Sequence, residues 1–110
     1  MPLFMYQAAY TSESWAAQVK NPQDRIETMA RQVCEAVGGK LIGGWLCMGE
    51  YDLVLIADVP NVESMAGIAM AFAAGGSGKG GRTTALMTGA QGIEALKNAG
   101  KVTKTYKPAQ

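Results

Sequence analysis

Histidine is absent from this sequence of 110 residues. Histidine is the side chain that most often acts as an acid or base near neutral pH, and it is the commonest metal ligand. Its absence excludes a Ser-His triad, and a histidine-ligated zinc or haem, built from this chain alone. Cysteine is scarce as well, because Cys34 and Cys47 stand alone and form no CxxC pair. We therefore expect no metal site and no cofactor, and two buried free thiols that suit a reducing cytoplasm.

The sequence also lacks the marks of a secreted or membrane-spanning chain. The start, MPLFMYQAAY, has no basic segment, and the most apolar helical run, VESMAGIAMAFAA, is too short to cross a bilayer. We expect a cytoplasmic protein with no membrane partner.

Charge of one sign is not in excess overall, since the formal net charge is +1. The bases are nevertheless concentrated at the end, because residues 79–110 hold six bases and Glu94 as the only acid. These lysines are spaced singly, without the interleaved aromatic residues of a stacking surface. We interpret them as a solubilising tail and expect no nucleic-acid partner.

The stretch GGSGKGGRTT, residues 75–84, has the glycines, lysine and hydroxyls of a phosphate-binding loop. A Walker motif requires GxxxxGK[ST] between a strand and a helix. Here Gly80 follows Lys79, Ala73 stands where the first glycine belongs, and a helix precedes the loop. These departures exclude a Walker site and favour a flexible helix-to-strand connection. Two weaker alternatives remain: Lys79 and Arg82 receive an anion, or the loop covers a neighbouring pocket.

Apolar periodicity predicts the order β-α-β-β-α-β-α. Strands are expected at 3–10, 40–48, 53–59 and 82–87. A helical turn capped by Thr11 or Ser12 follows the first strand, and Asn21 and Pro22 predict the start of a helix that ends at Gly38. Asn61 and Thr88 are expected to cap helices at 62–74 and from 89 to Gly100. Two βαβ units give an α+β, ferredoxin-like sandwich over residues 1–100, with one sheet face open and a polar tail over 101–110.

The stretch GGKLIGGWLCMGEYDLVLIADVPN, residues 38–61, resembles the GYD domain family. The resemblance rests on the Gly-Gly helix stop, the MGEYD turn, the apolar strand and the VPN helix start. The pair Tyr10-Thr11 and the TYKP stretch near the end extend it over most of the chain, and the glycine-rich loop departs from it. The resemblance implies a small bacterial protein with a ferredoxin-like fold and no settled reaction.

The GEYD turn has two interpretations. Gly49 suits a tight turn and Asp52 suits local hydrogen bonding, so a structural role is favoured. In the functional alternative, Glu50, Tyr51 and Asp52 lie at the mouth of a pocket, where two carboxylates could act as base and orienting group.

The candidate ligand-binding residues outside this turn are Tyr6, Tyr10, Trp45 and Arg82. Phe4, Tyr6, Ala8 and Tyr10 are expected on one face of the first strand. Arg82 could hold an anion and a tyrosine hydroxyl could orient it. Core or interface packing is the favoured role for the aromatic residues.

An open sheet face predicts self-association, because it would otherwise expose a large apolar patch. We expect a homodimer of the dimeric α+β barrel type, or a larger closed oligomer such as an edge-paired trimer. The expected function is binding of a small anionic or aromatic ligand in a pocket at the subunit interface. The alternatives are a cofactor-independent isomerase or oxygenase, using Tyr10, Glu50, Asp52 and Arg82, and a purely structural interaction protein.

Overall fold

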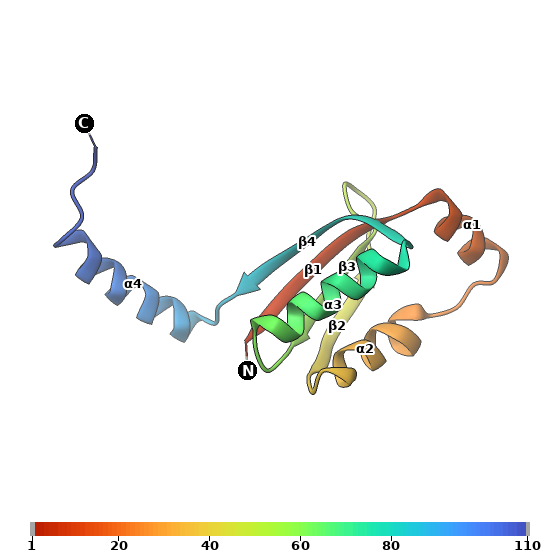
Figure 1. The fold of residues 1–110 in the computed structure, drawn as a ribbon, viewed down its shortest axis with the longest axis horizontal. Coiled ribbons are helices and arrows are strands. Elements are labelled where there is room, and N and C mark those ends of the chain that lie inside the picture. The colour runs from red at the N-terminus through yellow and green to blue at the C-terminus, as the bar shows by residue number, and fades with distance from the viewer. Residues whose placement is uncertain (1, 110) are drawn as a thin grey trace.

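The computed structural model describes residues 2–109. Four strands and their helices follow one another along the chain (Figure 1). Their bounds are β1 (Leu3–Tyr10), α1 (Ser12–Lys20), the π-helical η1 (Ile26–Ala30), α2 (Arg31–Ala36), β2 (Lys40–Leu46), β3 (Leu53–Asp58), α3 (Val62–Gly75), β4 (Gly78–Leu86) and α4 (Gly89–Thr103).

The four strands form one antiparallel sheet in the order β2-β3-β1-β4. Helices α2 and α3 lie across the same face of this sheet (Figure 1). The α+β class and the ferredoxin-like arrangement expected from the sequence are therefore confirmed. Within residues 2–109 no helix covers the other face of the sheet, where Trp45 is exposed.

The core lies between the sheet and the helices. Alternate residues of β1, Phe4, Tyr6 and Ala8, are buried on this side, as the sequence pattern predicted. Their neighbours Ala57 and Leu55 of β3 face the same way, because antiparallel partners share a face. The buried residues that form the core are Phe4, Tyr6, Ala8, Ala30, Cys34, Leu41, Leu55, Ala57, Val59, Met65 and Ile68.

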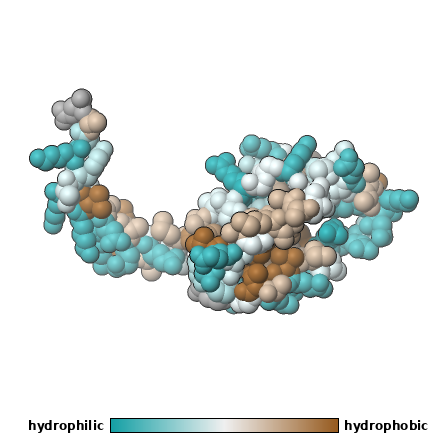
Figure 2. All heavy atoms as spheres, in the orientation of Figure 1, coloured by the Kyte–Doolittle hydropathy of each residue, from teal (hydrophilic) through white to brown (hydrophobic). Residues whose placement is uncertain are grey.

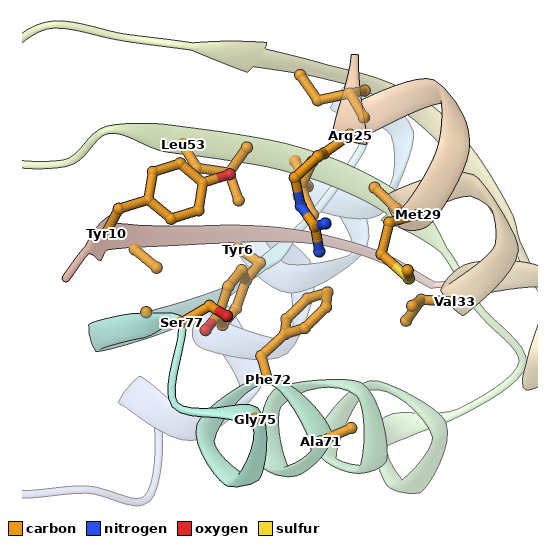
Figure 3. Close-up of a pocket in the computed structure, with 15 residues that line it drawn as sticks. Tyr6, Tyr10, Arg25, Met29, Val33, Leu53, Ala71, Phe72, Gly75 and Ser77 are labelled. Carbon is orange, nitrogen blue, oxygen red and sulfur yellow. The ribbon is translucent and has the colours of Figure 1, made fainter. Parts of the chain in front are cut away.

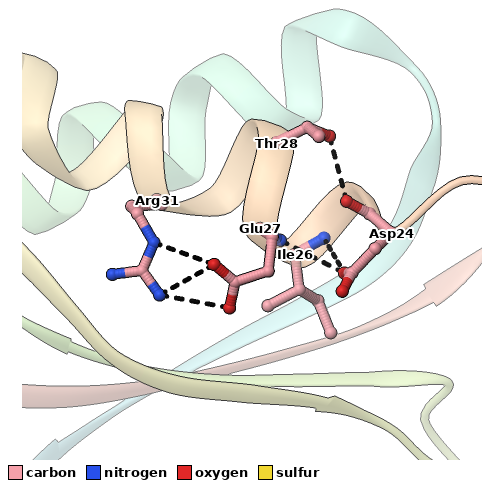
Figure 4. A network of polar contacts seen from close by, with 5 residues as sticks. All are labelled: Asp24, Ile26, Glu27, Thr28 and Arg31. Carbon is pink, nitrogen blue, oxygen red and sulfur yellow. Dashed lines mark hydrogen bonds and ion pairs between the residues drawn. The ribbon is translucent and has the colours of Figure 1, made fainter.

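The start of the second helical segment differs from the sequence prediction. Asn21 does not begin a helix but ends α1, where its N–H donates to the Ala17 carbonyl oxygen at 3.0 Å. The prediction was wrong because Thr11 caps a full helix over Ser12–Lys20 and not a single turn. The next segment begins at Asp24, whose Oδ1 accepts the N–H groups of Ile26 and Glu27 at 3.1 and 3.2 Å (Figure 4).

The last two elements also extend beyond their predicted bounds. Strand β4 begins at Gly78, so half of the glycine-rich loop belongs to the sheet. Helix α4 continues past Gly100 to Thr103 and projects away from the sheet (Figure 1). The radius of gyration is 17.4 Å, whereas a compact chain of this length has about 13 Å. Across residues 2–109, each helix falls short of the length and apolarity that crossing a bilayer demands.

Candidate functional site

A cavity of about 310 Å³ lies between the sheet and the helices of one chain, near the ends of β1 and α3 (Figure 3). Its walls are mostly apolar side chains from the sheet, from the η1–α2 segment and from α3. The lining residues are Tyr6, Ala8, Tyr10, Arg25, Ile26, Met29, Ala30, Val33, Leu53, Leu55, Ala71, Phe72, Gly75, Ser77 and Gly78.

Two aromatic pairs fix the tyrosines of the cavity. The Tyr6 and Phe72 ring centroids are 5.2 Å apart in a tilted arrangement, which ties β1 to α3. The Tyr10 ring meets Trp15 of α1 edge-on, with 5.1 Å between the centroids. Packing against Phe72 and Trp15 therefore fixes the positions of both tyrosine rings and of their hydroxyls.

Arg25 supplies the positive charge of the cavity, and its guanidinium points toward Tyr6 and Phe72 (Figure 3). The residue directly follows Asp24, whose side chain caps the segment, so the backbone at Arg25 is held (Figure 4). Glu27 does not neutralise it, because that carboxylate pairs with Arg31 at 3.0 Å. The ion pairs within residues 2–109 are Glu27–Arg31 and Glu94–Lys97. In this part of the chain Arg25 thus has no carboxylate partner.

The phenols of the cavity are shifted toward their neutral forms. Burial raises the pKa of the Tyr6 hydroxyl above its usual 10.0. Burial also raises the pKa of Tyr10; the Arg25 guanidinium lowers that pKa and the Asp52 carboxylate raises it further. Both hydroxyls are therefore protonated at neutral pH and can donate a hydrogen bond.

A second, polar recess of about 240 Å³ adjoins the cavity and shares Arg25 and Ser77 with it. Its remaining walls come from α1 and the segment after it: Ser14, Ala17, Gln18, Asn21 and Gln23. Arg25 and Ser77 thus stand at the boundary between an apolar chamber and a polar one.

The glycine-rich stretch forms one edge of the cavity through Gly75, Ser77 and Gly78. Gly76 ends α3 in the left-handed region with φ of 73°, which only glycine adopts at little cost. At Gly81 an added Cβ would lie 2.6 Å from the Tyr6 hydroxyl oxygen. Gly76 thus allows α3 to end, and Gly81 allows β4 to pass close to the Tyr6 hydroxyl. Neither Lys79 nor Arg82 lines the cavity.

The GEYD turn joins β2 to β3 and is tied to β1. The Tyr10 N–H donates to Asp52 Oδ2 at 2.9 Å, and the Asp52 N–H donates to the Ala8 carbonyl oxygen at 3.0 Å. Asp52 thereby holds the backbone of Tyr10 beside the cavity without lining it. Glu50 is exposed and Tyr51 is half-buried, and both lie outside the cavity wall.

Trp45 and Arg82 lie on the open face of the sheet. Trp45 pairs with Val54, and Arg82 pairs with Gln7, on the side opposite Tyr6. The structure thus brings Tyr6 and Tyr10 together in the cavity, with Asp52 behind Tyr10. It separates them from Trp45 and Arg82.

Sequence reasoning did not single out Arg25, Phe72 or Ser77 as site residues. Phe72 falls within the helix predicted over 62–74, and Ser77 falls within the glycine-rich loop. The available signal for Arg25 was its position directly after Asp24, a residue type that favours helix starts. Within residues 2–109, side chains of His, Cys, Asp and Glu form no group of three or more suited to a metal ion.

The sheet order, the layer of helices on one face and the cavity between them define a small ferredoxin-like α+β domain with a recess of ligand size. The model of the GYD domain matches residues 4–96. The chain therefore belongs to the GYD domain family, as its central motif indicated.

A solved structure agrees on the fold. The crystal structure of MtbAldR is similar to this chain with a TM-score of 0.51 and 12% sequence identity. The similarity covers 79% of this chain and 52% of the other, so the present chain spans about half of that protein's length. No curated protein sequence matches the chain.

Proposed function

We propose that this protein binds a small amphipathic anion, a molecule with one ring or a short alkyl body and a carboxylate-type head. One observation carries the proposal. Arg25, which has no carboxylate partner within residues 2–109, points into a cavity that is otherwise lined mainly by apolar side chains. A cation at the edge of an apolar chamber is the arrangement that orients an amphipathic anion.

The size of the cavity supports a small ligand. Its volume of about 310 Å³ lies at the lower end of the range of roughly 300–1,000 Å³ found for ligand pockets. The apolar body would lie against Phe72, Val33 and Leu55, away from water. The head group would lie at Arg25, with the Tyr10 and Ser77 hydroxyls as donors and the polar recess beyond them.

The state of the tyrosines favours binding over proton transfer. A general base must be ready to accept a proton near the working pH, whereas burial raises the pKa of Tyr6 and of Tyr10. Neutral phenols donate hydrogen bonds to an anion instead. The cofactor-independent isomerase or oxygenase stays a prediction, as does the placement of a pocket at a subunit interface.

The test is isothermal titration with 4-phenylbutyrate and with 4-phenylbutanol, which shares its body but lacks its charge. We expect the unchanged protein to prefer the acid, and Arg25→Gln to lose roughly five- to tenfold in affinity for the acid and little for the alcohol. Arg82→Gln is the matched control, because it removes the same charge from the opposite sheet face. Equal affinity of Arg25→Gln and unchanged protein for the acid would refute the proposal, and so would a loss confined to Arg82→Gln.

Self-association is part of this proposal for a physical reason. Leu3, Met5, Val54 and Ile56 share the uncovered face of the sheet, and each is only partly buried within the chain. Covering such a face with a second copy would remove apolar surface from water. Direct pairing of two open faces, as in the dimeric α+β barrel expected from the sequence, stays a prediction.

A further inference from the structure

Helix α4 is formed, but within residues 2–109 it lies apart from the sheet and from the other helices (Figure 1). None of its residues is buried, and Figure 1 shows it projecting from the end of β4. Ile93, Leu96 and Val102 are 54%, 68% and 58% exposed. Apolar side chains of this size are normally covered in a folded protein, so α4 lacks its packing surface.

The sequence of α4 indicates that the helix needs a packing surface to be stable. An isolated helix of this length is marginal in water even when it is rich in alanine. The interior glycines Gly92 and Gly100 each weaken α4 by about 1 kcal/mol relative to alanine. A capping box between Thr88 and Gln91 fixes the start of the helix, with bonds of 2.8 and 3.1 Å. One cap does not offset two glycines, so tertiary packing must stabilise the rest of α4.

The two faces of α4 indicate what it packs against. Leu96 and Val102 lie on one side with the small residues Ala95 and Ala99 between them, whereas Ile93 lies nearer the lysines. Lys97, Lys101 and Lys104 lie on the opposite side, toward solvent (Figure 2 shows the mostly hydrophilic colour of this arm). A face of small residues suits close approach to a surface that carries large side chains.

The open face of the sheet is such a surface. It carries Met5 of β1, Ile56 of β3 and Leu86 of β4, and Trp45 of β2 is 55% exposed beside them. The lengths agree as well, because a helix of 15 residues is about 22 Å long and a strand of 8 residues is about 27 Å long.

We propose that α4 packs on the open sheet face of a second copy of this chain, so that two copies exchange their C-terminal helices. The connection from β4 to α4 is only Met87 and Thr88, and Thr88 is held in the capping box, so α4 is directed away from its own sheet. The two parts of the chain carry net charges of opposite sign, which favours the approach of α4 to a second copy. Residues 87–110 carry four lysines and one glutamate, whereas residues 1–86 carry eight acids and six bases.

The first test measures molar mass by light scattering on the full-length protein. We expect a dimer, and we expect Leu96→Asp on the apolar side of α4 to raise the dimer dissociation constant by roughly thirtyfold or more. Asn98→Asp is the matched control, because it adds the same charge to the polar side of the same helix and should leave the dimer intact. A monomeric unchanged protein, or a Leu96→Asp dimer as stable as the Asn98→Asp dimer, would overturn the proposal.

The second test locates the helix. Chains with Leu96→Cys are mixed with tagged chains with Ile56→Cys, both also carrying Cys47→Ser, and treated with a short bismaleimide. The natural Cys34 is buried and burial raises its pKa, so it should not react. We expect a cross-link between one chain of each kind. A third variant carries Leu96→Cys, Ile56→Cys and Cys47→Ser in one chain. A link that forms only within that chain would mean that α4 folds back on its own sheet. A dimer without any link would mean direct pairing of the open faces, and either result would refute helix exchange.

Discussion

Gly81→Ala tests why the glycine-rich stretch is rich in glycine. The added Cβ would lie 2.6 Å from the Tyr6 hydroxyl oxygen, which falls 0.8 Å short of the 3.4 Å at which ordinary contact begins. Tyr6 is 6% exposed and its ring packs against Phe72, so it cannot move outward. It can move inward, because it lines the cavity.

This geometry sets the size of the effect. Overpacking a core costs about 1–3 kcal/mol, and the adjacent cavity places Gly81→Ala near the lower end, at about 1 kcal/mol. In a domain of this size that corresponds to a fall in Tm of about 4–8 °C. The displaced ring would occupy cavity volume, so affinity for 4-phenylbutyrate should fall several-fold.

The assay is a double-mutant cycle with Tyr6→Phe, measured by urea unfolding and by titration. Removing the hydroxyl leaves the Tyr6 Cε1 and Cζ at 3.2 Å from the added Cβ, so Gly81→Ala should cost less than half as much in the Tyr6→Phe background. Gly67→Ala in α3 is the control for a glycine whose added Cβ would meet open space, and it should raise the free energy of unfolding by about 1 kcal/mol. Strictly additive costs, or unchanged stability in Gly81→Ala, would show that the Tyr6 hydroxyl does not require a glycine at position 81.

Two further predictions concern the neighbours of the cavity. Asp52→Ala should lower the free energy of unfolding by about 1 kcal/mol, because the Tyr10 N–H loses its acceptor. The control, Glu50→Ala, removes an exposed carboxylate and should change that free energy little. Equal effects of the two substitutions in urea unfolding would contradict this prediction. Burial raises the pKa of Tyr10 above 10.0, so its contribution to stability is complete below that pH and is lost above it, as the unfolded chain ionises before the folded one. Urea midpoints followed through this pH range should fall less steeply in Tyr10→Phe than in a control with the exposed Tyr106→Phe, and identical slopes would show that Tyr10 ionises normally.

The layers of the fold could be predicted because local signals agreed with one another. Alternation in β1 and the asparagine cap at Asn61 each point to the observed elements. The MGEYD motif placed the chain in its family. The helix start at Asn21 failed because an Asn-Pro pair suits either the end of one helix or the start of another, and the Thr11 cap decided between them.

The cavity was less accessible to sequence reasoning because its walls come from segments distant along the chain. Tyr6 and Tyr10 could be named because strand alternation sets their face. Trp45 and Arg82 were grouped with them, although alternation alone does not say which face carries the helices. Arg25 depends on the turn that Asp24 holds, and its approach to the cavity is a tertiary feature.

The most direct test of the central claim is a titration of ¹⁵N-labelled protein with 4-phenylbutyrate, followed through the backbone amides and the indole N–H groups. We expect saturable shifts at Arg25, Ser77 and Gly78 around the cavity, with the Trp45 indole and Arg82 unmoved. Shifts centred on Trp45 and Arg82, with the amides around the cavity unchanged, would contradict it and would place any ligand on the open face of the sheet.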